Sequence, residues 1–487
     1  MIRRALTTAS TALLCLGTAA CAVGPDYHRP SAPVPSAYKE LQGWKTSQPN
    51  DAVDRGPWWS VFQDPTLDAL ERQVDISNQN LEAAAAAYLQ ASAVAREAGA
   101  ALFPSVGLGL SGTRQGGAGN ATTGTGGSTA PRNSYELQGN VGWDLDIWGR
   151  IRRQKESAVA SAQASAADLA GARLSAQADL AIDYFELRAA DQLQKLLDET
   201  VDGYKKSLTI TQNQYTVGVV SRLDVITAQT QLDTAESEDV NVGVQRASLE
   251  HAIAVLIGKA PGDFSLPAGT LTAAVPDVPV TRPSALLERR PDIAAAERQM
   301  AAANAEIGVE EAGYFPDISL SGLLGYANNA FAKLATAPKR VWSVGADATA
   351  NLFNGGATQG AVSAAQAAYD GSVANYRQTV LTAFQGVEDQ LATLRILAQQ
   401  ATVQGQAVKD STQAANIALN QYRAGISVYT AVVTAQATQL ASEQTALSLQ
   451  QQRLTASVIL IEDLGGGWSS DELPDSGDAS DGKATHP

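Results

Sequence analysis

The sequence predicts a mainly helical membrane protein of mixed α and β structure, in which one architectural unit occurs twice. The first observation is a repeated Tyr-x-x-Gly motif: Tyr215 and Gly218 recur as Tyr422 and Gly425, 207 positions later (422 minus 215). The second is that each copy contains two segments of alternating apolar and polar residues, and the third is that each copy continues into a very long helical segment. A repeat of roughly two hundred residues is far longer than a solenoid unit, so a complete structural unit was duplicated.

The N-terminus is typical of an export signal. Arg3-Arg4 and an apolar stretch are followed by Thr18-Ala19-Ala20 and then Cys21. This resembles a bacterial lipoprotein signal, which makes residues 1–20 the signal peptide and Cys21 the lipidated first residue of the mature chain. Ala22, in place of aspartate, resembles the pattern of lipoproteins sent to the outer membrane. An ordinary cleavable signal with an incidental cysteine is the alternative.

Composition excludes several classes of protein. The formal net charge of −15 argues against a nucleic-acid surface, which needs a basic face. No later run of about twenty residues is both apolar and free of charge, so no helical membrane span is expected. Residues 21–66 are rich in proline and turn formers and are expected to form an extended arm, in which Trp58-Trp59 pack against a larger body.

Alternation of apolar and polar side chains predicts four strands, at about 103–112, 134–146, 315–326 and 341–352. In the second of them Tyr135, Leu137 and Val141 share one face, and Glu136 and Gln138 share the other. A half-buried sheet in a soluble domain gives the same alternation. Four such strands of about ten residues, on an exported chain, favour a transmembrane β-barrel.

Each pair of strands leads through glycine into a long helix. Gly149 precedes the first and Gly355-Gly356 the second, because glycine tolerates the backbone angles needed to leave a strand abruptly. A near-heptad apolar stripe predicts coiled-coil-like packing, and a helix of about 68 residues would be about 100 Å long. The Tyr-x-x-Gly turn then reverses the chain. The expected segments are a first repeat at 67–258 (long helix 150–216, return helix 222–257), a linker at 259–283, a second repeat at 284–465 (long helix 356–422, return helix 429–464) and an acidic tail at 466–487, expected to be disordered.

Four strands imply a partner. A strand in hydrocarbon cannot leave an unpaired edge, and the smallest barrels use about eight strands. The chain must therefore pool its strands with copies of itself, as eight strands from two protomers or twelve from three. Only a wider barrel leaves an open channel.

Three segments carry a resemblance to a known family: Leu286 to Ile293 (LLERRPDI), Asp144 to Arg150 (DLDIWGR) and the turn from Gly218 to Val225. They closely resemble the TolC-like outer-membrane efflux proteins, and among these the NodT- or OprM-type lipoproteins of resistance-nodulation-division (RND) pumps. The resemblance implies a homotrimer with a 12-stranded outer-membrane β-barrel, four strands per protomer, a long periplasmic α-helical barrel and a small equatorial domain. It also implies a lipid anchor at Cys21, a location in the bacterial outer membrane with a large periplasmic portion, and two partners, a periplasmic adaptor (membrane fusion) protein and an inner-membrane RND pump.

By the same resemblance, the helix tips form the periplasmic gate and dock the adaptor. The tip residues are Tyr215, Gly218, Ser221, Arg222, Leu223 and Asp224 in the first copy, and Tyr422, Gly425, Ser427 and Tyr429 in the second. The second tip departs from the family pattern, because relatives often carry acidic residues near Ser427 and at the position of Thr434, and an arginine at that of Ala437. Its gate is therefore expected to be weaker or held differently. Solvated helix ends without a role in gating are the alternative, since exposed ion pairs contribute only about 0 to 1 kcal/mol each.

Nothing in the sequence predicts catalysis or a metal site. The three histidines, His28, His251 and His486, lie in the arm, a helical repeat and the tail, and no nucleophile elbow, phosphate loop or metal-spaced cysteine pair occurs. No cofactor is expected apart from the diacylglycerol and fatty acyl groups on Cys21. The predicted function is a passive trimeric conduit that exports small molecules, such as drugs or other toxic compounds. The alternatives are the outer-membrane conduit of a type I protein secretion system and, in another class, a periplasmic structural coiled-coil protein.

Overall fold

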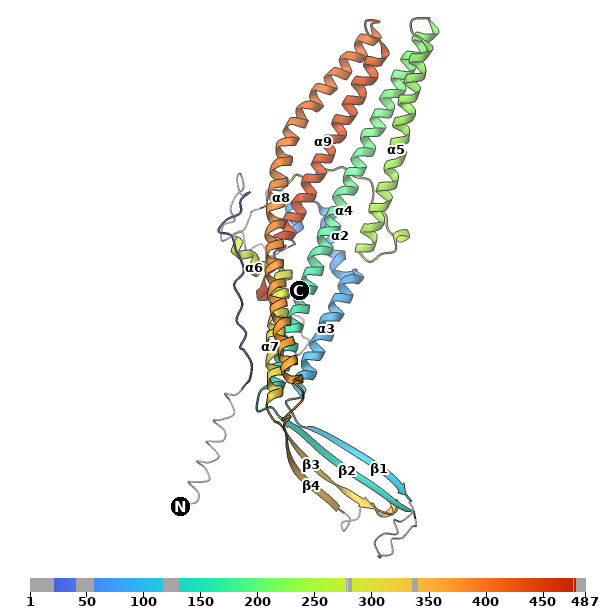
Figure 1. The fold of residues 1–487 in the computed structure, drawn as a ribbon. Coiled ribbons are helices and arrows are strands. Elements are labelled where there is room, and N and C mark those ends of the chain that lie inside the picture. The colour runs from blue at the N-terminus through green and yellow to red at the C-terminus, as the bar shows by residue number, and fades with distance from the viewer. Residues whose placement is uncertain are drawn as a thin grey trace, which may run out of the picture.

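The computed structural model describes residues 22–40, 57–116, 131–276, 278, 283–334, 340–475 and 477–478. The molecule is long and narrow, with a β-sheet at one end and two helical hairpins whose tips lie at the other (Figure 1). The signal peptide and Cys21 lie outside the described residues, as do 41–56 of the predicted arm and parts of the linker. Among the described residues, no helix combines the length and the apolar character needed to cross a membrane.

A single antiparallel sheet contains the four strands in the order β1-β2-β3-β4. The register places the apolar residues of neighbouring strands side by side, for example Leu110 opposite Leu137 and Trp143 opposite Leu320. The predicted apolar faces therefore merge into one. The face is exposed in the single chain, where Leu108 and Val344 are 80% and 81% accessible. The strands are β1 (Ser105–Gln115), β2 (Arg132–Leu145), β3 (Asp317–Asn328) and β4 (Arg340–Thr349).

The two copies have matched helical hairpins. The long helices α4 (Arg150–Thr216) and α8 (Ala357–Arg423) each contain 67 residues, and the return helices α5 (Arg222–Leu256) and α9 (Tyr429–Asp463) each contain 35. The first residue of α8 lies 207 positions after that of α4, and the same offset separates their last residues. The offset is also 207 for both ends of α5 and α9. At 1.5 Å per residue a helix of this length spans about 100 Å. Glycine begins both long helices in the left-handed conformation, with φ of +85° at Gly149 and +91° at Gly356.

Shorter helices brace the half of the long helices that is nearer the sheet. In each copy they precede the strands: α2 (Pro65–Ser77) and α3 (Gln79–Ala100) in the first, α6 (Leu286–Arg289) and α7 (Pro291–Glu311) in the second. The helical pattern of 67–99 is thus divided in two. Asn78 causes the break, because its side chain accepts hydrogen bonds from the backbone N–H groups of Asn80 and Leu81 and caps α3.

The main hydrophobic core lies midway along the molecule. It contains Trp58, Trp59 and Phe62, together with side chains from α2, α4, α6, α7, α8 and α9. Trp58 and Trp59 are buried, which confirms the prediction that they are packing residues.

The beginning of the predicted tail is ordered, so the expectation of disorder from residue 466 is wrong for 466–475. Trp468 and Leu473 pack against a cluster of Ala167, Ala294 and Ala295, and the side-chain amide of Gln163 donates a hydrogen bond to the carbonyl of Pro474 at 3.0 Å. The acidic composition concealed these apolar contacts. The residues from 479 onward lie outside the described part of the chain.

Candidate functional site at the helix tips

The first tip reverses the chain through a glycine turn. The N–H of Gly218 donates to the carbonyl of Tyr215 and that of Val219 to the carbonyl of Gln214, both at 2.9 Å. Gly218 has a φ of +79°, which residues with a Cβ adopt only with strain. A Cβ at this position would meet no atom within 4 Å, so the requirement for glycine comes from the backbone angle and not from crowding.

A capping box begins the return helix of this tip. The Ser221 hydroxyl accepts from the N–H of Asp224 at 3.3 Å, and the Asp224 carboxylate accepts from the N–H of Ser221 at 3.0 Å. The box thus gives a side-chain acceptor to two N–H groups at the start of the helix. Arg222 and Leu223 project from the first turn and are exposed.

The second tip has the same turn but no capping box. Gly425, with a φ of +74°, donates to the carbonyl of Tyr422, and Ile426 donates to that of Gln421. The residues that correspond to Ser221 and Asp224 are Val428 and Ala431, and Val428 makes no side-chain cap. Ser427 is half-buried, and its hydroxyl reaches only the carbonyl of Val428, at 3.4 Å.

The tyrosines of the second tip are buried between the two hairpins. Tyr422 and Tyr429 are 3% and 2% exposed, and their rings lie 5.1 Å apart. They pack with Val201, Tyr204 and Leu232 of the first hairpin. Burial raises the pKa of both tyrosines, so both hydroxyls stay protonated over the physiological range.

Polar contacts also join the hairpins in this region. The Tyr422 hydroxyl donates to Thr211 Oγ1 at 3.2 Å and the Tyr429 hydroxyl to Gln231 Oε1 at 3.3 Å. The Gln231 amide donates in turn to Gln436 Oε1 at 3.3 Å. Sequence reasoning missed Thr211, Gln231 and Gln436, because isolated polar residues on a mostly polar helix carry no periodic signal.

The same motif therefore has opposite surroundings in its two copies. Tyr422 is buried, whereas Tyr215 is 47% exposed. Tyr429 is buried, whereas Arg222, at the corresponding position, is exposed. Tyr422 and Tyr429 of the second tip thus pack against the first hairpin. Tyr215, Arg222 and Leu223 of the first tip are instead exposed.

Replacing Ser221 with alanine is expected to destabilise the first turn of α5 by about 0.5–2 kcal/mol, because the N–H of Asp224 loses its side-chain acceptor and keeps only the Ser221 carbonyl, at 3.2 Å. Amide hydrogen exchange of the segment from 221 to 226 should accelerate. The matched control installs the missing box in the second tip as Val428→Ser with Ala431→Asp, and exchange there should slow. Equal exchange in the wild type and both variants would contradict this assignment.

Among the described residues, no group of three or more histidine, cysteine, aspartate or glutamate side chains could hold a metal ion. The exposed apolar strand face instead suits a protein that assembles with other chains.

Known proteins share this sequence and this architecture. The model of the outer membrane efflux protein family matches residues 70–259 and 283–466. The probable efflux pump outer membrane protein TtgC of Pseudomonas putida is 31% identical over 472 residues, which is 96% of either chain. The pyoverdine export outer membrane protein OpmQ of Pseudomonas aeruginosa is 30% identical over 469 residues, 94% of this chain and 96% of the relative.

Solved structures agree with the sequence relatives. The outer-membrane channel OprN superposes with a TM-score of 0.85 and 30% identity over 92% of this chain and 100% of its own. The MtrE outer membrane channel of Neisseria gonorrhoeae gives 0.82 with 26% identity over 92% and 99%. The chain therefore belongs to the outer membrane efflux protein family, with its TolC-like fold of two repeats and four strands, and is an efflux channel protein and not an enzyme.

Proposed function

We propose that the chain is the outer-membrane component of a tripartite efflux system of the RND type and that three copies form one passive conduit for small molecules. The observation that carries the proposal is a four-stranded sheet with one continuous apolar face, joined directly to helical hairpins about 100 Å long. The family membership described above supports it and argues against a structural coiled-coil protein.

The open sheet supports assembly. Among the described strands, β2 and β3 have neighbours on both sides, whereas β1 and β4 each have a neighbour on one side and present an edge on the other. Three sheets joined β4 to β1 would satisfy both edges and give twelve strands, which leaves a water-filled bore. The arm, the linker of 259–283 and the C-terminal residues would form the equatorial belt around the helices.

The relatives support small molecules as the exported cargo. Their names describe the efflux of toluene, of antibiotics and of pyoverdine. These names favour small-molecule export over type I protein secretion. An adaptor protein at the helix tips and an inner-membrane pump would complete the system.

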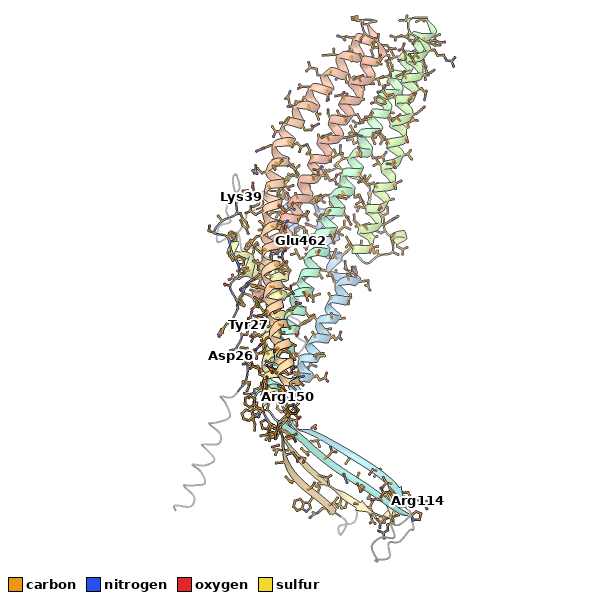
Figure 2. The ribbon with its side chains drawn as sticks, in the orientation of Figure 1. Asp26, Tyr27, Lys39, Arg114, Arg150 and Glu462 are labelled. Carbon is orange, nitrogen blue, oxygen red and sulfur yellow. The ribbon has the colours of Figure 1, made fainter. Side chains whose placement is uncertain are left out.

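A lipid anchor at Cys21 fits the path of the arm. Ala22 lies against Gly149, where a Cβ would come within 2.8 Å of the Ala22 Cα, and the N–H of Val23 donates to the carbonyl of Trp148 at 2.9 Å. Asp26, close to the strand–helix junction near Arg150 in Figure 2, forms an ion pair of 2.8 Å with Arg153. The residue that follows the proposed lipidation site, Ala22, therefore lies beside the end of the sheet.

The conduit is tested by reconstitution. Full-length protein in detergent should run as a trimer in native gels, and it should conduct ions in planar lipid bilayers. In a strain without its own outer-membrane channel, it should restore drug resistance when the cognate pump and adaptor are supplied. A protein that stays monomeric and stable without detergent would refute the proposal.

The proposed docking and gate residues are the ten tip residues named above, and the two tip glycines give the sharpest test. Valine at Gly218 or Gly425 is expected to abolish resistance without loss of trimer, because β-branched residues do not adopt the left-handed conformation readily. Asparagine is the matched control, since it tolerates this conformation, and should retain most of the resistance. Full resistance of both valine variants would contradict a role for the tips.

A further inference from the structure

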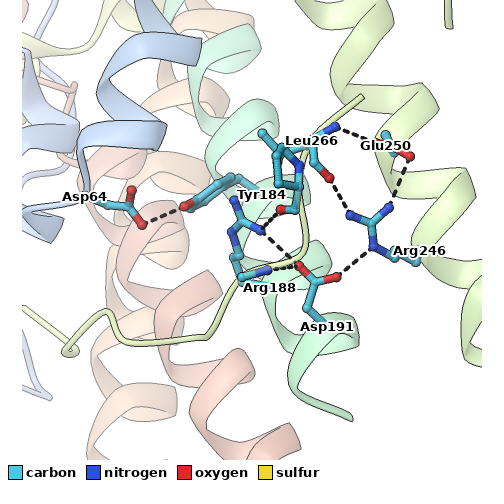
Figure 3. A network of polar contacts seen from close by, with 9 residues as sticks. Asp64, Tyr184, Arg188, Asp191, Arg246, Glu250 and Leu266 are labelled. Carbon is cyan, nitrogen blue, oxygen red and sulfur yellow. Dashed lines mark hydrogen bonds and ion pairs between the residues drawn. The ribbon is translucent and has the colours of Figure 1, made fainter. Parts of the chain in front are cut away.

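A buried ionic cluster clamps the linker onto the first helical hairpin (Figure 3). The Asp191 carboxylate lies between two arginines, 2.9 Å from Arg188 Nη1 and 2.7 Å from Arg246 Nε, and it also accepts from the N–H of Gly269 at 2.9 Å. Asp191 is only 2% exposed at its side chain. Arg188 of α4 also donates to the carbonyl of Pro267, and Arg246 of α5 donates to that of Leu266, so the linker is bound to both helices of the hairpin.

The second hairpin keeps the two arginines but not the carboxylate between them. The helices of the two copies correspond residue for residue at the offset of 207, so Arg188 corresponds to Arg395 and Arg246 to Arg453. Asp191 corresponds to Ala398. The second hairpin therefore has both guanidinium groups, those of Arg395 and Arg453, but no side chain that corresponds to the Asp191 carboxylate.

A second polar pair is also replaced by alanines. In the first hairpin the Gln194 amide donates to the Asp239 carboxylate. The corresponding residues of the second hairpin are Ala401 and Ala446. Three side chains that fill the first site are thus reduced to methyl groups in the second.

A cavity of about 280 Å³ lies beside two of these replaced side chains, at Ala401 and Ala446. Ala401, Ala446, Gln450 and Arg453 line it from the helices, and the linker residues 273–275 line it from outside. The linker passes over the first hairpin at residues 266–269 and then over the second, where Gln450 Nε2 approaches the Leu271 carbonyl at 3.5 Å. The same linker therefore covers the filled site and the cavity in succession.

The arginines at the second site have donors without acceptors. Within the described residues, the Arg453 side chain makes no hydrogen bond or ion pair, and its Nε is buried. Arg395 donates from Nη2 to Glu40 at 2.6 Å, but its own Nε is buried without an acceptor. A buried guanidinium N–H without an acceptor is unfavourable, and a carboxylate is the group that matches its geometry.

We propose that this cavity is a binding site for the carboxylate group of a small organic acid, held by the Arg453 guanidinium with Gln450 beside it. The bound carboxylate takes the place that Asp191 has in the first hairpin, and it joins the second hairpin to the linker. The volume lies near the lower end of the range of small-molecule sites, about 300 Å³, so the site suits a small acid and not a drug-sized molecule. In the first repeat the carboxylate belongs to the chain itself, as the Asp191 side chain, whereas in the second it comes from a ligand bound from solution.

Succinate serves as the probe, and its neutral diamide, succinamide, is the control for charge. We expect titration calorimetry on the full-length protein in detergent, at constant ionic strength, to show saturable binding of succinate and a rise of the melting temperature with succinate alone. Arg453→Gln should weaken binding by about tenfold or more, a difference of about 1.4 kcal/mol. Arg423→Gln, which removes the same charge from an exposed position at the end of α8, should bind as the wild type does.

Ala398→Asp gives a second test that does not depend on loss of an arginine. It restores the aspartate found at Asp191, so the variant should melt at a higher temperature without succinate and should no longer respond to it. Absence of saturable succinate binding by the wild type, or equal binding by Arg453→Gln, would overturn the proposal. A succinate response kept in full by Ala398→Asp would also overturn it, because the carboxylate would then bind elsewhere.

Discussion

Replacement of Asp191 with alanine is expected to lower the free energy of unfolding by about 3–5 kcal/mol, because it leaves buried charge without a partner. Arg188 has a side chain that is only 8% exposed, and it would lose its ion pair while keeping its desolvation cost. Arg246 would keep Glu250, at 3.2 Å, and the Leu266 carbonyl. The linker would lose the acceptor for the N–H of Gly269.

The measurement is urea unfolding of the detergent-solubilised protein at one fixed protein concentration, since the stability of an oligomer depends on concentration. Asp198→Ala is the matched control, because Asp198 lies on the same helix and is exposed. It should change the free energy of unfolding by less than about 0.5 kcal/mol. A similar small change for Asp191→Ala would show that the cluster contributes little.

Alanine at Gly258 or at Gly465 is expected to lower the free energy of unfolding by about 2–5 kcal/mol. Both glycines have a positive φ, +68° and +95°, which costs an L-residue roughly 1–2 kcal/mol. A Cβ would also lie 2.0 Å from the Ser77 carbonyl oxygen at Gly258, and 2.1 Å from that of Arg289 at Gly465. Backbone must therefore move, and overpacking of this kind costs about 1–3 kcal/mol.

The two glycines lie at corresponding junctions, at which the end of a return helix meets the break between two bracing helices, α2 and α3 at Gly258 and α6 and α7 at Gly465. At the first, Ser77 Oγ donates to the carbonyl of Ile257 at 2.6 Å. At the second, Arg290 donates to the carbonyl of Asp463 at 2.9 Å and forms an ion pair with its side chain. We expect both variants to melt earlier and to yield less trimer.

Gly243→Ala is the control for this pair and should have the opposite sign. Gly243 lies inside α5 with no atom near a Cβ, so alanine should raise the free energy of unfolding by about 0.5–1 kcal/mol. Unchanged melting of the Gly258 and Gly465 variants would mean that the close approach of the backbone is easily relieved.

The local periodicities of the sequence were sufficient to predict the strand faces and the helical hairpins. Apolar residues at every second position gave the face that contains Leu137 and Val141, because successive side chains of a strand point to opposite sides. The tip glycines were equally predictable, since a left-handed turn requires glycine. The strand ends differed by a few residues, as at β4, which ends at Thr349 instead of 352.

Contacts between distant segments had no such signal. Asn78 caps α3 locally, but the contact that joins this break to α5 is not local: the Asn78 side-chain amide donates to the carbonyl of Leu256, at the C-terminal end of α5, at 2.9 Å. The ordered tail depends on Gln163 and Ala167, more than three hundred positions earlier in the chain (474 minus 163). Neither partner can be read from the residues next to the segment.

By itself, the sequence determined that one unit of two strands and a helical hairpin is present twice, because alternation, helical periodicity and turn glycines are local properties of the chain. Only the tertiary structure decided that Tyr422 is buried while Tyr215 is exposed, although the two share one motif. It also decided that Asp191 pairs with Arg188 of its own helix and with Arg246 of the return helix, 55 positions later in the chain. The physical reason is that the burial and pairing of a side chain depend on which segments, far apart in the sequence, pack against it. Each helical hairpin packs against the other with one of its faces only.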